Sequence, residues 1–115
     1  MFNVKKQGTV TVITLTVSEL TVVNASEFKQ KVLNHLAGDG SIQHVVLDME
    51  QVKFIDSSGL GSLISLLRSS IDYRQQLALA GMSRPVQALF ELMRMHQVFD
   101  IYATVDLAEI GLSKL

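Results

Sequence analysis

The centre of this chain is the segment Phe54-Ile55-Asp56-Ser57-Ser58-Gly59-Leu60-Gly61. The short apolar run Val45-Val46-Leu47 comes before it and is typical of a strand covered on both faces. An amphipathic pattern from Ser57 to about Asp72 follows and predicts a helix. The segment therefore joins a buried strand to a helix. In open α/β folds, that edge of the sheet is where sites are usually built.

On the amino-terminal side, residues 2–17 are rich in β-branched residues and alternate in polarity, with a turn at Lys6-Gln7-Gly8. This pattern predicts an antiparallel strand pair. The adjacent apolar residues Val12 and Ile13 break the alternation, which indicates either a bulge or burial on both faces. A helix is expected next, with Asn24 as its cap, Glu27 completing a capping box and Gly38 ending it.

On the carboxyl-terminal side, the same alternation of strands and helices continues. Leu77-Ala78-Leu79-Ala80 predicts a buried strand, and a helix follows Arg84-Pro85. A short strand at Ile101-Tyr102 and a last helix over residues 105–112 complete the chain. Such an order implies right-handed crossovers. We predict an α/β fold: one domain over residues 1–115, with a mixed, mostly parallel sheet, an N-terminal β-hairpin and about four helices.

Composition narrows the class of protein. The 115 residues are 48% hydrophobic and 18% charged, with a net charge of −1 and no cysteine. Disulfides and thiolate sites are therefore excluded. No basic block predicts nucleic-acid binding, and no apolar run approaches the roughly 20 residues that span a bilayer. Because the start lacks the pattern of a secretory signal, we expect a cytoplasmic protein without direct membrane insertion.

The helix after the central segment has two predicted faces. At about 100° per residue, one face is apolar and should meet the core: Leu60, Leu63, Ile64, Leu67 and Ile71. The opposite face carries small residues: Ser58, Gly61, Ser62, Ser65 and Ser69. Leu66 falls between them and is predicted to be an exposed apolar contact. Such a strip is either an ordinary solvated face or a surface that a partner approaches closely.

Ser58 is predicted to lie in the first turn of this helix, where backbone amides lack partners and the helix dipole is positive. A phosphate on its hydroxyl would be accommodated there. The alternative interpretation is that Ser57 and Ser58 serve only as N-cap residues.

The segment Asp56-Ser57-Ser58-Gly59-Leu60-Gly61 resembles the signature of the STAS domain family, specifically of its anti-sigma factor antagonists. The resemblance extends through nearly the whole chain. It implies that Ser58 is the phosphoacceptor, surrounded by Asp56, Ser57, Gly59 and Gly61. It also implies a binding partner that is both an anti-sigma factor and a serine kinase of the GHKL type, and a metal-dependent serine phosphatase that reverses the modification.

The expected partner-binding surface combines a loop with the exposed side of the helix. Its residues are Ser18, Glu19, Leu20, Thr21, Val22, Val23, Ser62, Ser65, Leu66 and Ser69. One position departs from the family pattern, which often has Gly-Glu-Leu-Asp here, because Thr21 replaces the usual aspartate. Kinase recognition is therefore expected to differ from that of typical members.

Enzymatic alternatives have less support. No Gly-x-Ser-x-Gly elbow or phosphate-binding loop is present, and His35, His44 and His96 share no metal-ligand spacing. The carboxylates Asp48, Glu50 and Asp56 lie close in sequence and leave open a metal or phosphoaspartate site. We expect no catalytic activity and no cofactor. The second functional hypothesis is an unphosphorylated STAS scaffold within a transporter or signalling complex.

Overall fold

A five-stranded sheet forms the centre of the computed structural model, which describes residues 1–38 and 43–115. In sheet order its strands are β1 (Phe2–Gln7), β2 (Val10–Leu15), β4 (His44–Asp48), β6 (Leu77–Ala80) and β7 (Asp100–Tyr102). The first two strands pair antiparallel, and all other neighbours pair parallel. The predicted mixed, mostly parallel sheet with an N-terminal hairpin is confirmed.

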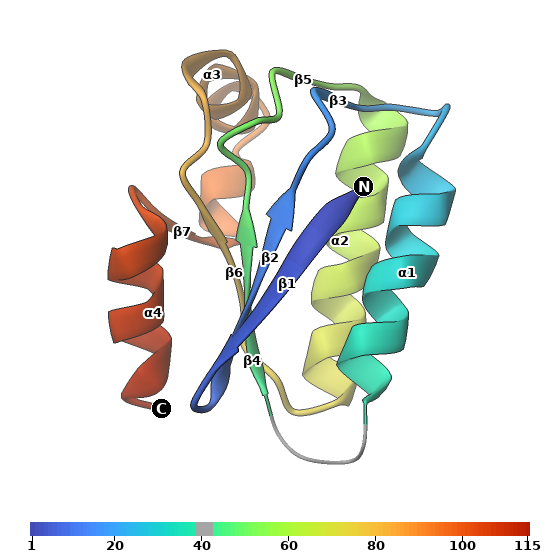
Figure 1. Ribbon diagram of the computed structural model, residues 1–115. Coiled ribbons are helices and arrows are strands. Elements are labelled where there is room, and N and C mark those ends of the chain that lie inside the picture. The colour runs from blue at the N-terminus through green and yellow to red at the C-terminus, as the bar shows by residue number, and fades with distance from the viewer. Residues whose placement is uncertain (39–42) are drawn as a thin grey trace.

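Helices cover both faces of this sheet (Figure 1). They are α1 (Ala25–Ala37), α2 (Ser57–Asp72), α3 (Arg84–Leu92) and α4 (Val105–Ser113), with a 3-10 turn η1 (Met95–Gln97) after α3. The helices α1 and α2 lie side by side on one face, and α4 lies on the other. The four predicted helices are thus confirmed, and the predicted bounds of α2 and β6 are those of the structure.

The sheet is buried on both sides, and this explains the irregular alternation in β2. Ile13 packs into the larger core beneath α1 and α2, together with Phe28 and Leu63. Val12 belongs to a separate cluster beneath α4, with Leu112. The register between β1 and β2 runs without interruption from Phe2 opposite Leu15 to Gln7 opposite Val10. Of the two predicted alternatives, two-sided burial is correct and a bulge is not.

Two short strands that the sequence did not predict join the loops beside α1 and α2. They are β3 (Glu19–Leu20) and β5 (Phe54–Ile55), which pair in parallel. Each turns one residue inward, since Leu20 and Ile55 are buried while Glu19 and Phe54 are exposed. This small sheet lies at the end where both helices begin (Figure 1). It fixes the loop of residues 18–23 beside the first turn of α2.

The predicted capping box of α1 does not form. The Asn24 side chain accepts a hydrogen bond from the Thr21 amide (3.0 Å) and donates one to the Glu19 carbonyl (2.9 Å). Glu27 instead forms an ion pair with Lys31 at 3.0 Å. The Asn24 side chain therefore stabilises the loop that precedes the helix and does not bond to the amides of the helix. This arrangement depends on β3, which contributes the Glu19 carbonyl. Gly38 ends the helix as predicted, with φ +42°.

The orientation of α2 also differs from the prediction. Leu60 and Leu63 are buried as expected, but Leu66 is completely buried and Ile71 is 66% exposed. Ser62, predicted to face solvent, is only 6% exposed, and its hydroxyl donates to the Gly59 carbonyl at 2.6 Å. The physical reason is that α2 packs against α1 as well as the sheet, so its buried arc includes the side that faces α1. Small residues there allow the two helices to approach closely.

Candidate functional site

Asp56 organises the junction between β5 and α2. Its carboxylate accepts hydrogen bonds from the Gly59 amide (2.9 Å) and from the Val22 amide in the β3–α1 loop (3.0 Å). These two bonds are the main reason why the pKa of Asp56 is held below its ordinary value. The N-cap of α2 is therefore Asp56. The alternative interpretation, in which Ser57 and Ser58 serve only as N-cap residues, is wrong, since both lie within the first turn of the helix.

Gly59 is required by the close contact between α2 and β3. A Cβ atom at this position would overlap the backbone carbonyl of Leu20 and lie 2.9 Å from the Ile55 side chain. Gly61 has no such restriction, because a Cβ atom there would meet nothing within 4 Å. The first glycine of the motif thus has a structural role inside the chain. The second leaves an open surface beside the first turn of α2.

Ser58 lies half-buried in that first turn and lines a groove of about 330 Å³. The groove lies between the start of α1 and the start of α2, and its other lining residues are Val22, Ala25, Ser26, Lys29, Gly61 and Ser62. The Ser58 side chain therefore borders open space rather than the core. There is room in the groove for a group attached to the hydroxyl.

Exposed apolar side chains surround this end of the molecule. Val22 and Val23 in the loop are 73% and 89% exposed, and Phe54 on β5 is 54% exposed. Sequence reasoning missed Phe54, although the opposite exposures of Phe54 and Ile55 are the period-two pattern of a strand. Large apolar residues on the surface mark candidate protein-binding sites when they gather in one region.

The predicted partner-binding surface is only partly available. Ser18, Glu19, Val22 and Val23 are exposed, whereas Thr21, Ser65 and Ser69 are half-buried. Leu20, Ser62 and Leu66 are buried, which corrects those three assignments: Leu20 and Leu66 cannot present their side chains to a partner, and Ser62 only borders the groove. Leu20 is buried because β3 turns it inward, and the other two because α2 packs against α1.

Thr21, the residue that departs from the family pattern, serves the local turn. Its hydroxyl oxygen accepts a hydrogen bond from the Val23 amide (3.3 Å), and its own amide donates to Asn24. It is not among the described residues that line the groove beside Ser58.

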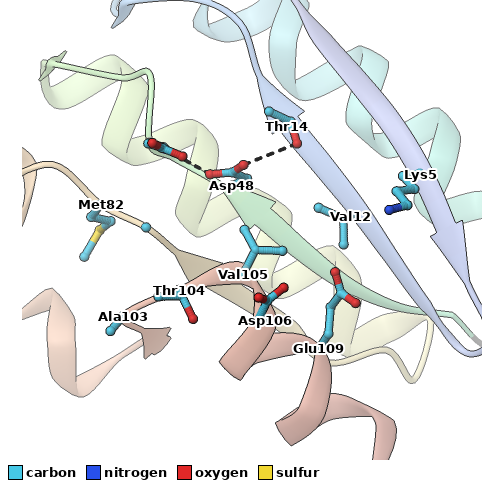
Figure 2. A pocket seen from close by; sticks show the side chains of 12 residues that line it. Lys5, Val12, Thr14, Asp48, Met82, Ala103, Thr104, Val105, Asp106 and Glu109 are labelled. Carbon is cyan, nitrogen blue, oxygen red and sulfur yellow. Dashed lines mark hydrogen bonds between the residues drawn. The ribbon is translucent and has the colours of Figure 1, made fainter.

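A second hollow of about 600 Å³ lies between the sheet and α4 (Figure 2). Asp48 and Glu50 border it, and Asp106 and Glu109 reach toward it from α4. The Asp48 carboxylate accepts from the Glu50 amide (3.1 Å) and the Thr14 hydroxyl (3.4 Å), as the dashed lines show. Asp56 is absent from this lining because it caps α2.

The three carboxylates that the sequence placed close together therefore do not form one site. Within residues 1–38 and 43–115, no three histidine, aspartate or glutamate side chains are arranged to hold a metal ion. In the same ranges, no helix combines the length and apolar character needed to cross a membrane.

Comparison with solved structures finds the same fold in regulatory proteins and in a transporter. An anti-sigma factor antagonist (STAS) domain protein from Planctomyces limnophilus is 20% identical, with a TM-score of 0.85 and 97% of each chain covered. The anti-sigma factor antagonist SpoIIAA in its unphosphorylated form is 19% identical, with a TM-score of 0.81, 100% of this chain covered and 98% of the other. The phosphorylated form of Bacillus SpoIIAA matches at a TM-score of 0.68, with 20% identity over 94% of this chain and 96% of that one.

The murine anion transporter Slc26a9 is 24% identical over 96% of this chain, with a TM-score of 0.77. This match covers only 19% of the transporter's own chain. The family model of the STAS domain matches residues 1–108, a range that includes the Asp56-to-Gly61 segment at the start of α2. By that match, the chain belongs to the STAS domain family.

Proposed function

We propose that this chain is an anti-sigma factor antagonist whose choice of partner is controlled by phosphorylation of Ser58. The observation that carries the proposal is the position of Ser58. It borders an open groove in the first turn of α2, and the exposed side chain of Val22 lines the same groove. That arrangement combines an accessible hydroxyl with a surface suited to binding a protein. The family relationship and the fold shared with SpoIIAA, solved in phosphorylated and unphosphorylated forms, support it.

In this proposal the unphosphorylated chain binds an anti-sigma factor and so releases the sigma factor. The anti-sigma factor is also a GHKL-type serine kinase. This chain binds that partner through a docking surface made of the exposed loop residues Val22 and Val23, Phe54 of β5, and Ser57 and Gly61 of α2. Apolar side chains supply most of the contact, while the small residues of α2 allow a close approach.

Phosphorylation then ends the association. A phosphate adds a charge of about −1.5 to −2 at the centre of the contact. Burying that charge against a partner without a matching cation is unfavourable. A loss of about 2.7 kcal/mol lowers affinity a hundredfold, which is enough to reverse a competition for the kinase. A metal-dependent serine phosphatase restores the active form. The chain is ligand and substrate, and catalysis belongs to its partners.

The test uses a GHKL kinase encoded near this gene, with ATP and the full chain. Mass spectrometry should place the phosphate on Ser58. Ser58→Ala should remain unmodified and bind the kinase, and Ser58→Asp should bind at least tenfold more weakly while remaining folded. Ser57→Ala is the matched control and should still be phosphorylated. Phosphate on Ser57, or equal binding by Ser58→Ala and Ser58→Asp, would contradict the proposal.

A second candidate function is a constitutive scaffold within a transporter complex. The match to Slc26a9 over 96% of this chain, together with Thr21 in place of the usual aspartate, favours it. A scaffold of this kind should associate with its complex equally well in the Ser58→Asp and wild-type forms. Co-purification of both forms with transporter components encoded nearby would distinguish the two functions.

A further inference from the structure

We infer that Lys29 of α1 is the counter-ion of phosphorylated Ser58 and draws the phosphate into the groove between α1 and α2. This inference rests on the proposed function, because it concerns the modified form of Ser58. It assigns a regulatory role to a residue outside the Asp56-to-Gly61 segment.

The groove itself provides the first argument. Lys29 is half-buried, and among the described residues that line the groove it alone carries a charge. The remaining lining is apolar or contributes only small hydroxyl side chains. A lysine is a compact charge on a flexible four-carbon stem, so it can follow a group attached to the opposite wall. A dianion on Ser58 would therefore face a mobile cation within the same groove.

The second argument concerns the start of α2. A phosphate at a helix N-terminus usually accepts hydrogen bonds from free backbone amides. Here the Gly59 amide already donates to the Asp56 carboxylate, and the Leu60 amide donates to the Asp56 carbonyl at 3.0 Å. Two amides of this first turn, those of Gly59 and Leu60, are therefore already engaged within the chain. A side-chain cation would supply compensating charge that these two amides do not.

Two charged groups are placed at this junction by the described contacts: Asp56 at the N-cap of α2 and Lys29 in the lining of the groove. Asp56 precedes α2, and its low pKa keeps it ionised throughout the range in which a phosphoserine titrates, near pH 6. Lys29 is contributed by α1, and the loop supplies the uncharged Val22. The charge of Asp56 therefore stays constant while the phosphate titrates, and so does its effect on the pKa of the phosphate. Removing the charge of Lys29 isolates its effect on the phosphate.

The chain supplies a matched control on the same helix. Lys31 lies two residues from Lys29, but it is exposed and forms an ion pair with Glu27. It is not among the residues that line the groove. Lys29→Gln and Lys31→Gln thus remove the same net charge from α1. Only the first removes it from the groove.

The experiment measures the second ionisation of the phosphate by 31P NMR, in full-length chains with phosphoserine incorporated genetically at position 58. Lys29→Gln should raise this pKa by about half a unit, which is about a threefold change in proton affinity. Lys31→Gln should leave it within about 0.1 unit of the unsubstituted chain. Lys29→Arg should restore the lower value, and about 1 M salt should abolish the differences.

Equal pKa values in the unsubstituted and Lys29→Gln chains would overturn the inference, as would equal shifts from Lys29→Gln and Lys31→Gln. Because the phosphoserine is incorporated without a kinase, this result is independent of the proposed function. Failure of a kinase to modify or bind the chain would contradict the function alone. Circular dichroism of each variant checks that the fold is retained, and Lys29→Arg provides a second, charge-conserving variant.

Discussion

The two glycines of the Asp56-to-Gly61 segment differ in what surrounds them. Gly59→Ala should destabilise the fold by about 3 kcal/mol, because its Cβ atom would meet the Leu20 carbonyl, which belongs to a paired strand and cannot move freely. Gly61→Ala should leave stability unchanged or raise it by up to about 1 kcal/mol, since alanine favours a helix. Denaturant unfolding of both variants measures this contrast, and equal losses would show that the junction is packed differently.

Gly61→Ala also tests the docking surface. If the small residues of α2 allow a partner to approach closely, this folded variant should bind the kinase more weakly than the unsubstituted chain. Lys31→Gln, which lies away from the groove, is a suitable control for this measurement. Unchanged binding by Gly61→Ala would place the contact elsewhere.

Asp56 should make stability depend on pH. Its pKa in the folded chain lies below the unfolded value, mainly because of the hydrogen bonds from Gly59 and Val22. The ionised carboxylate therefore stabilises the fold above an unfolded pKa of about 3.9, and this contribution is lost as the pH falls through the lower folded pKa. The gap in unfolding free energy between the unsubstituted chain and Asp56→Asn should be constant from pH 7 to 5 and shrink below pH 4. A gap that does not change with pH would contradict this role.

At the scale of a single element, the rotation of α2 can be tested by two substitutions. Leu66→Ala should cost about 2–5 kcal/mol, because Leu66 is completely buried between α2 and its neighbours. Ile71→Ala should cost less than about 0.5 kcal/mol, because its side chain is largely exposed. Thermal or denaturant unfolding distinguishes these values. The helical pattern of the sequence alone predicts the opposite order.

The same element shows what a sequence can and cannot predict here. The bounds of α2 followed from local signals, namely the serines at its start and the apolar period of the helix. The rotation of α2 about its axis could not be predicted, because Leu66 and Ile71 are both apolar and lie on different sides of the helix. Only the position of α1 decides that Leu66 is buried and Ile71 is exposed. The cap was misassigned for a similar reason. Asp56 becomes the cap because β3 brings the Val22 amide to its second oxygen.

At the scale of the whole molecule, the sheet separates two regions that should behave independently. Leu112→Ala in α4 removes a buried side chain from the cluster beneath that helix and should cost about 2–5 kcal/mol. The kinase affinity of the folded fraction should stay the same, because Ser58 and its groove lie on the other face. Calorimetric binding at low temperature, corrected for the folded fraction, measures this. A loss of affinity similar to that of Ser58→Asp would show that the faces are coupled.

The contact between Gly59 and the Leu20 carbonyl links the serine-bearing turn to a strand more than thirty positions earlier in the sequence. If a kinase modifies Ser58 as proposed, it therefore meets a hydroxyl presented by tertiary structure rather than by an extended peptide. A synthetic peptide spanning residues 52–64 should consequently be a poor substrate, even though it contains every neighbour of the acceptor in the sequence. Substrate selection would then act on shape, and a cell with many similar serine motifs could keep its signalling routes separate.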